Sequence, residues 1–430
     1  MITNCAACAA PLAHDAPKCV RCKTRYCNAT CQHDHWRGHE QDCELIHRGG
    51  NAEQYHADKN YKEAVKVVAE ACAEDTAGQT CWICFDGGSE EGLVRGCACR
   101  RAAGFAHASC LARQAQVGVA EAEDSEEEDN LNEEVFDERW TRWHTCGLCE
   151  KKYHGVVKCA LGWACWKTYL GRPESDWSRG AAMTQLGNGI SNAEHNKDAL
   201  NVREAELSML LRVGASKDRL LAVQGNLATT YHSLGRLEEA FRLRRGVYSG
   251  NLKLYGEEHE ETLSAANNYA LALAKLQRSE EVKSLLRKTI PVARRVLGED
   301  STTTLVMRRA YAYTLYESYR DTGTTVQSRL DDLREALVTL SDSSLIAQRV
   351  LGGAHPLTVD IENRLGTVRA VHHAILRFLE TPPPGGSTWR NHSSLLQPLQ
   401  KEEHTRRSQL RRSPAPPTAP WSSSTGTRPP

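Results

Sequence analysis

The chain has 430 residues, a length that allows two or three domains. Lysine plus arginine and aspartate plus glutamate each number 54, so no charge excess points to nucleic acid, and none is expected as a partner. No apolar run approaches the roughly 20 residues of a membrane span, and none precedes Cys5, so neither membrane attachment nor export is expected. The seventeen cysteines therefore predict reduced, metal-binding thiols and a cytoplasmic location, with the nucleus as an alternative.

Residues 1–48 contain four closely spaced pairs of metal-binding side chains. The pairs are Cys5 and Cys8, Cys19 and Cys22, Cys27 and Cys31, and His39 and Cys43. A Cys-x2-Cys turn brings two thiolates to one metal ion, and residues four apart lie on one face of a helix. Eight such ligands are enough for two closed, tetrahedral zinc sites. A disulfide-bonded knot is the disfavoured alternative, because nothing indicates export.

The run from Tyr26 to Cys43 resembles a MYND-type zinc finger. MYND fingers bind proteins, and several dock short proline-containing peptides, so the resemblance implies that Gln32 and Trp36 contact a peptide. Trp36 could instead be the core aromatic residue of a module with little apolar interior. The resemblance also implies which ligands share an ion: Cys5, Cys8, Cys27 and Cys31 hold one, and Cys19, Cys22, His39 and Cys43 hold the other.

Residues 49–78 are predicted to form a helical spacer. Tyr61, Ala64, Val65 and Val68 recur at helical intervals within residues 54–74. Cys72 has no partner at a metal-binding interval, so we interpret it as a small buried apolar residue.

Residues 79–155 contain a second set of eight candidate ligands. They are Cys81 and Cys84, Cys97 and Cys99, His107 and Cys110, and Cys146 and Cys149. One residue separates the third and fourth ligands, and seven residues then precede His107. This spacing resembles a RING-CH domain and differs from that of a PHD finger. The resemblance implies that Cys81, Cys84, His107 and Cys110 share one zinc ion and that Cys97, Cys99, Cys146 and Cys149 share another, which makes four ions in the chain.

The RING-CH resemblance implies a ubiquitin-protein ligase that recruits a ubiquitin-conjugating enzyme and forms no covalent intermediate. Ile83 matches the apolar docking position of the family, and Trp143 and Leu148 are weaker candidates. Core packing is the alternative role for Ile83. Whether the chain is an enzyme stays open, because intact ligands preserve the fold of a domain that has lost its partner. The competing hypothesis is a non-enzymatic scaffold that binds other proteins.

An acidic insert, residues 121–138, lengthens the interval before the last ligand pair. Its dense negative charge predicts a disordered loop. The insert also casts doubt on the helix that RING-CH domains have before their last two ligands.

Residues 156–378 are predicted to form stacked helical hairpins. Similar tetrapeptides end at Gly214, Gly256, Gly298 and Gly352, at intervals of 42, 42 and 54 residues, and the longer step indicates an insertion near residues 319–328. The pattern resembles the tetratricopeptide repeats of kinesin light chains. In related repeats, asparagines bind a peptide backbone, and Asn226 and Asn268 fit that place, although local capping or packing is equally expected.

The remaining segments complete a mainly α architecture. Cys159, Cys165, Trp163 and Trp166 are expected to pack over the first hairpin. Residues 379–430, rich in proline, serine and arginine, predict a disordered tail. The leading hypothesis combines a RING-CH domain that recruits the conjugating enzyme with a MYND finger and repeats that recruit a protein or peptide substrate.

Overall fold

The computed structural model describes residues 5–8, 10, 12, 15–87, 90–100, 103–124, 132–319 and 325–380. The regular structure of these residues is helical, with isolated β-bridges and no strands, which confirms the predicted mainly α class. They divide into two compact units, one ending at Arg236 and the other beginning at Leu237. Beyond Glu380, the predicted tail lies outside the described residues. No helix in the described ranges is long and apolar enough to cross a membrane.

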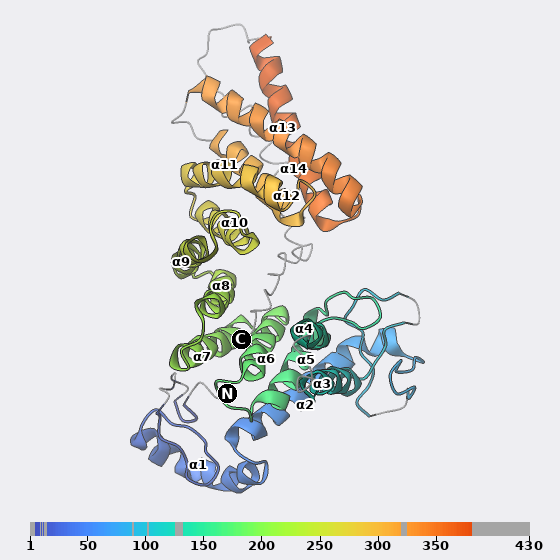
Figure 1. Cartoon of the computed structure of the whole chain (residues 1–430), viewed down its shortest axis with the longest axis vertical. Coiled ribbons are helices and arrows are strands. Elements are labelled where there is room, and N and C mark those ends of the chain that lie inside the picture. The colour runs from blue at the N-terminus through green and yellow to red at the C-terminus, as the bar shows by residue number, and fades with distance from the viewer. Residues whose placement is uncertain are drawn as a thin grey trace. The chain divides into compact units, whose positions relative to one another are not determined.

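The first unit contains both sets of cysteines and eight α-helices within its described residues (Figure 1). These are α1 (Ala29–Arg48), α2 (Ala52–Thr76), α3 (Ala108–Asp124), α4 (Asn132–Trp140), α5 (Gly155–Tyr169), α6 (Trp177–Asn192), α7 (Asn196–Arg212) and α8 (Lys217–Ser233), with a short 3-10 helix, η2 (Thr141–Trp143), after α4.

Helix α2 lies within the predicted helical spacer, residues 49–78. It does more than connect two modules. Its first turns place Ala52 and Tyr55 against the buried residues of the first cysteine module. Ala57 is buried among the aromatic residues of α5, and Val68 is buried in the second cysteine module. This helix therefore braces three separate apolar clusters.

Helix α5 is buried along its length and lies close to α6. Two glycines permit this approach: a Cβ atom at Gly162 would lie 2.9 Å from the carbonyl oxygen of Gln185, and one at Gly189 would lie 2.6 Å from that of Lys158. Trp163, Trp166 and Cys165 are buried here, as predicted, whereas Cys159 is partly buried. The N-terminal half of α5 also contributes Val157, Ala160 and Leu161 to the core of the second cysteine module.

The described parts of the acidic insert are helical, so the expectation of a disordered loop is wrong for residues 121–124 and 132–138. Glu123, in α3, is paired with Arg172 by two hydrogen bonds of 2.6 and 2.8 Å. Trp140, at the end of α4, lies 4.9 Å from Trp177 and 5.2 Å from Tyr169 between ring centroids. The prediction considered only the density of negative charge and did not foresee the contacts of Glu123 and Trp140. The structure also has a helix, α4, before the last ligand pair, which the insert had put in doubt.

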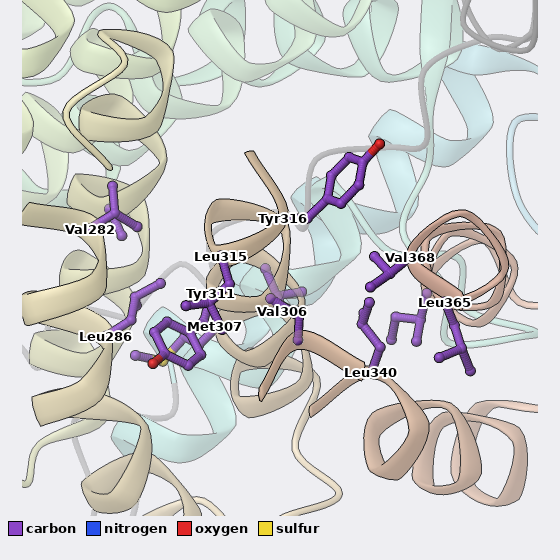
Figure 2. Packing of buried hydrophobic residues seen from close by; sticks show 14 of the residues in the cluster. Val282, Leu286, Val306, Met307, Tyr311, Leu315, Tyr316, Leu340, Leu365 and Val368 are labelled. Carbon is purple, nitrogen blue, oxygen red and sulfur yellow. The ribbon is translucent and has the colours of Figure 1, made fainter. Parts of the chain in front are cut away.

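The second unit consists, in its described residues, of six helices that pack in sequence order. They are α9 (Leu237–Tyr255), α10 (Glu260–Lys275), α11 (Ser279–Val296), α12 (Thr302–Tyr319), α13 (Val326–Leu351) and α14 (Pro356–Glu380). Figure 2 shows Leu286 of α11, Met307 and Leu315 of α12, and Leu340 and Leu365 of the last two helices in one apolar core. Part of the predicted insertion lengthens α13, which has 26 residues compared with 18 in α11.

The repeated glycines end helices in a conformation that other residues rarely adopt. Gly214, Gly256, Gly298 and Gly352 have φ angles of 65°, 83°, 91° and 82°. A side chain disfavours this region of backbone space, which explains why the repeat returns to glycine at this place.

A matched pair of glycine substitutions tests this explanation. Gly256→Ala should reduce the free energy of unfolding by about 1–2 kcal/mol, because φ is positive there although the surrounding space is open. Gly246→Ala, within α9 and also in open space, should instead raise it by about 0.5–1 kcal/mol. Urea unfolding followed by circular dichroism measures both effects, and equal effects of the same sign would contradict the explanation.

Candidate metal centres and the adjoining groove

The structure brings all sixteen predicted ligands together in four groups of four. The groups are Cys5, Cys8, Cys27 and Cys31; Cys19, Cys22, His39 and Cys43; Cys81, Cys84, His107 and Cys110; and Cys97, Cys99, Cys146 and Cys149, and the ligand atoms of each group lie within 4.8 Å of one another. Each group alternates with its neighbour along the chain, as in cross-braced modules. The last group joins residues on either side of the insert.

The sulfur–sulfur distances in the second and fourth groups fit a tetrahedral zinc site. Zn–S bonds of about 2.3 Å place two sulfur atoms roughly 3.8 Å apart. The Sγ atoms of Cys19 and Cys43, and those of Cys99 and Cys146, are separated by 3.8 Å. All seventeen cysteines are free, so the disulfide alternative is not supported. A group of four protein ligands leaves no open position, which fits a structural ion better than a hydrolytic one.

The two histidines face their groups through different ring nitrogens. Nε2 of His39 lies 3.2 Å from Sγ of Cys22, whereas Nδ1 of His107 lies 3.4 Å from Sγ of Cys84. His39 reaches its group from α1, where it lies four residues before Cys43. His107 directly precedes α3, and Glu91 helps to fix the start of that helix by accepting a 2.7 Å hydrogen bond from the backbone N–H of Ser109.

The Cys-x2-Cys turns share a backbone geometry that the sequence did not reveal. The residues that follow three of these turns, Lys23, Phe85 and Glu150, have φ angles of 63°, 62° and 55°. Each donates its backbone N–H to the carbonyl of the first cysteine of its turn, at 2.8–3.0 Å. Left-handed residues are usually glycine or asparagine, and neither stands here, so composition alone did not signal the turn.

Backbone N–H groups in these turns favour the thiolate form of selected cysteines. Burial opposes ionisation of Cys19 and Cys81, but hydrogen bonds from backbone N–H groups outweigh it and lower the pKa of Cys19 to about 6 and that of Cys81 to about 7. Thiolate is the form that binds metal, so the first cysteine of each of these two turns favours the metal-binding form.

Gly104 provides space for the fourth ligand group. Its φ angle is 84°, and a Cβ atom there would lie 2.6 Å from Cβ of Cys99 and 3.3 Å from Sγ of Cys97. We expect Gly104→Ala to lower the metal content by about one ion per chain, because Cys99 must move away. Elemental analysis after gel filtration measures this content.

The matched control for this substitution is Gly92→Ala in the same module. Gly92 also has a positive φ angle, 74°, and a Cβ atom there would lie 3.0 Å from the side chain of Ala69, with no ligand among its close neighbours. It should therefore share the backbone strain of Gly104→Ala but keep the full metal content. An unchanged content in Gly104→Ala would contradict the role of Gly104.

An open groove of about 640 Å³ adjoins the third ligand group. It lies between the turn that contains Ile83 and one side of α3, and the end of α4 borders it. The lining residues are Ile83, Cys84, Ser109, Cys110, Arg113, Gln114, Val117, Gly118, Glu121 and Arg139. Ile83 is half-buried, so it packs against the module's core and also lines the groove.

The other predicted contact residues of this module differ in exposure. Leu148 is 48% exposed in the turn between the last two ligands. Trp143 is 1% exposed and packs against Tyr169, so its expected docking role is wrong and it is a core residue. Phe85, 79% exposed in the turn that follows Cys84, escaped the sequence analysis. Its position beside a predicted docking residue was the available signal.

The predicted peptide-contact residues outside this module are partly accessible. Trp36 is 45% exposed, and Tyr26 is the buried aromatic residue of its module, so Trp36 is not the core aromatic residue. Gln32 is partly buried. Asn226, in α8, and Asn268, in α10, are both partly buried and belong to different units. The Asn268 amide donates a 3.0 Å hydrogen bond to the Ser264 carbonyl, as the local-packing alternative requires.

Comparisons with known proteins match two family models to separate parts of the chain. Residues 81–122 match the RING-variant domain, and residues 219–295 match the tetratricopeptide repeat. The first match ends before Cys146 and Cys149, which the structure nevertheless brings to Cys97 and Cys99. A RING-variant domain suggests a ligase-type function with binding of a conjugating enzyme, and the repeats suggest protein–protein interaction.

Several solved structures resemble the chain at low identity. BtubC (BKLC) from P. vanneervenii is 15% identical, with a TM-score of 0.33, and the alignment covers 65% of this chain and 96% of that one. A single-residue variant of a putative kinesin light chain from Podosopora anserina, with nearly identical TPR-like repeats, is 18% identical, with a TM-score of 0.36 and coverages of 56% and 97%. A second structure of that repeat protein is 16% identical, with a TM-score of 0.37 and the same coverages.

Proposed function

We propose that this protein is a RING-type ubiquitin-protein ligase that holds one zinc ion in each of its four ligand groups. The observation that carries the proposal is the groove beside the third group, where Ile83 and α3 form an accessible apolar surface next to a rigid metal-binding turn. The match to the RING-variant domain supports it independently. The zinc ions would stabilise the turns that present this surface.

The chemistry needs positioning more than a reactive side chain. A charged conjugating enzyme carries ubiquitin as a thioester, and the amine of a substrate lysine attacks the thioester carbonyl. The C–N bond of the isopeptide forms as the C–S bond breaks and the thiol leaves. Holding the thioester and the amine together lowers the entropic part of the barrier. No residue of this chain is therefore proposed as catalytic.

The remaining modules would recruit the substrate. We propose that the first cysteine module is a MYND-type finger that uses the exposed face around Trp36 and Gln32 for a peptide. The tetratricopeptide repeats supply a further protein-binding surface, for which Asn226 and Asn268 remain the candidate contacts. Two binding modules in one chain raise the effective concentration of a substrate near the thioester. A cytoplasmic location, with the nucleus as an alternative, belongs to this proposal.

An autoubiquitination assay tests the ligase activity. The zinc content of the whole chain is first measured, and only protein that holds four zinc ions is used. This protein is then incubated with ubiquitin, activating enzyme and a panel of conjugating enzymes. We expect ubiquitin ladders that disappear with a chelator and form at least about fivefold more slowly with Ile83→Ala, because loss of a central apolar contact costs about 1 kcal/mol or more.

The control for this assay is Val338→Ala, an exposed apolar residue on α13 in the second unit. It should form ladders at the rate of the unmodified protein. Absence of ladders with every conjugating enzyme, from zinc-loaded protein, would refute the ligase proposal and favour the non-enzymatic scaffold. Ladders that are insensitive to Ile83→Ala would refute the docking role of the groove.

A further inference from the structure

Two exposed arginines border the groove beside Ile83. Arg113 lies on α3 and Arg139 on α4, and neither makes a hydrogen bond or ion pair with another described residue. Glu121 is the one carboxylate among the described residues that line the groove. Glu123, two residues further along α3, is paired with Arg172.

The position of Arg139 is built into the fold. Helix α4 is anchored by Phe136 and Trp140, whose rings lie 5.3 and 4.9 Å from that of Trp177 between centroids. Gly118 of α3 faces the stem of Arg139, and a Cβ atom there would lie 3.5 Å from its Cδ. The long interval between Cys110 and Cys146 therefore places two arginines, Arg113 and Arg139, at the border of the groove.

We propose that Arg113 and Arg139 make this groove selective for conjugating enzymes with carboxylates beside their apolar docking residues. The inference rests on the proposed ligase function. Ile83, Val117 and Gly118 would receive the apolar residues, and each guanidinium group would then face a carboxylate. Charges at the border of an interface mainly set the association rate and exclude partners of like charge. A docking loop rich in lysine would be repelled by the same two side chains.

The test combines a charge reversal with its compensation. Two forms of one conjugating enzyme are used, with either glutamate or lysine at exposed docking-loop positions, and initial rates of ladder formation are measured at low and high salt. With the unmodified ligase, we expect ladders to form faster with the glutamate form than with the lysine form. The difference between the two rates should shrink at high salt, because salt screens the charges. The double variant Arg113→Glu and Arg139→Glu should lower its rate about tenfold and should restore the rate of the lysine form.

Arg245→Glu is the matched control, because Arg245 is an exposed arginine on α9, outside both cysteine modules, with no ion pair to another described residue. It should leave both rates unchanged, and all variants should retain the zinc content and the circular dichroism spectrum of the unmodified protein. Ladders whose rates do not depend on the charge of either partner would overturn the selectivity and leave the ligase proposal intact.

If the unmodified protein forms no ladder, the two proposals are separated by titration calorimetry. Each form of the conjugating enzyme is titrated without ubiquitin attached to it. Binding that prefers the glutamate form and is lost in the double variant would support the selective surface without ligase activity. No binding to either form would overturn both.

Discussion

The first unit depends on the close burial of helix α5. Val157 and Leu161 belong to the core of the second cysteine module, and Trp163 and Trp166 belong to an aromatic cluster shared with α2, α3 and α6. The approach of α6 requires the absence of side chains at Gly162 and Gly189. A helix that is apolar on all sides is stable only when it is covered on all sides. The second cysteine module therefore packs together with α5 and α6, the first helices of the predicted repeat region, although their sequence motifs differ.

This packing bears on how a ligase of the proposed kind would work. Catalysis by positioning requires a docking surface that does not shift relative to its support. The turn that contains Ile83 is held by its ligand group and by a hydrogen bond of 2.9 Å from the Trp82 backbone N–H to the Phe105 carbonyl. Helix α3, the other wall of the groove, is held at its start by Glu91 and near its end by Arg172. Both walls are thus fixed by contacts with neighbouring parts of the first unit.

The acidic insert illustrates how composition can mislead. Sequence reasoning weighed the carboxylates of residues 121–138 and predicted a disordered loop. The described residues of this stretch, 121–124 and 132–138, are helical, because Phe136 and Trp140 pack on aromatic residues from α5 and α6 and Glu123 has an arginine partner. These partners lie tens of residues away along the chain, so no local pattern could reveal them. The spacer prediction had the same weakness: the helix was correct, but its three packing contacts were not foreseen.

The sequence by itself determined the eight ligand pairs and the period of the helical repeat. Both are local: ligand pairs are separated by one to three residues, and the glycines recur because a positive φ angle is required at each turn. Tertiary structure decided which of the predicted contact residues are accessible. Trp143 is in the core, Leu148 and Trp36 are exposed, and Arg139 borders a groove that its own segment did not suggest. The exposure of a side chain depends on which helices, distant in sequence, pack over it. The spacing of residues along the chain does not predict that packing.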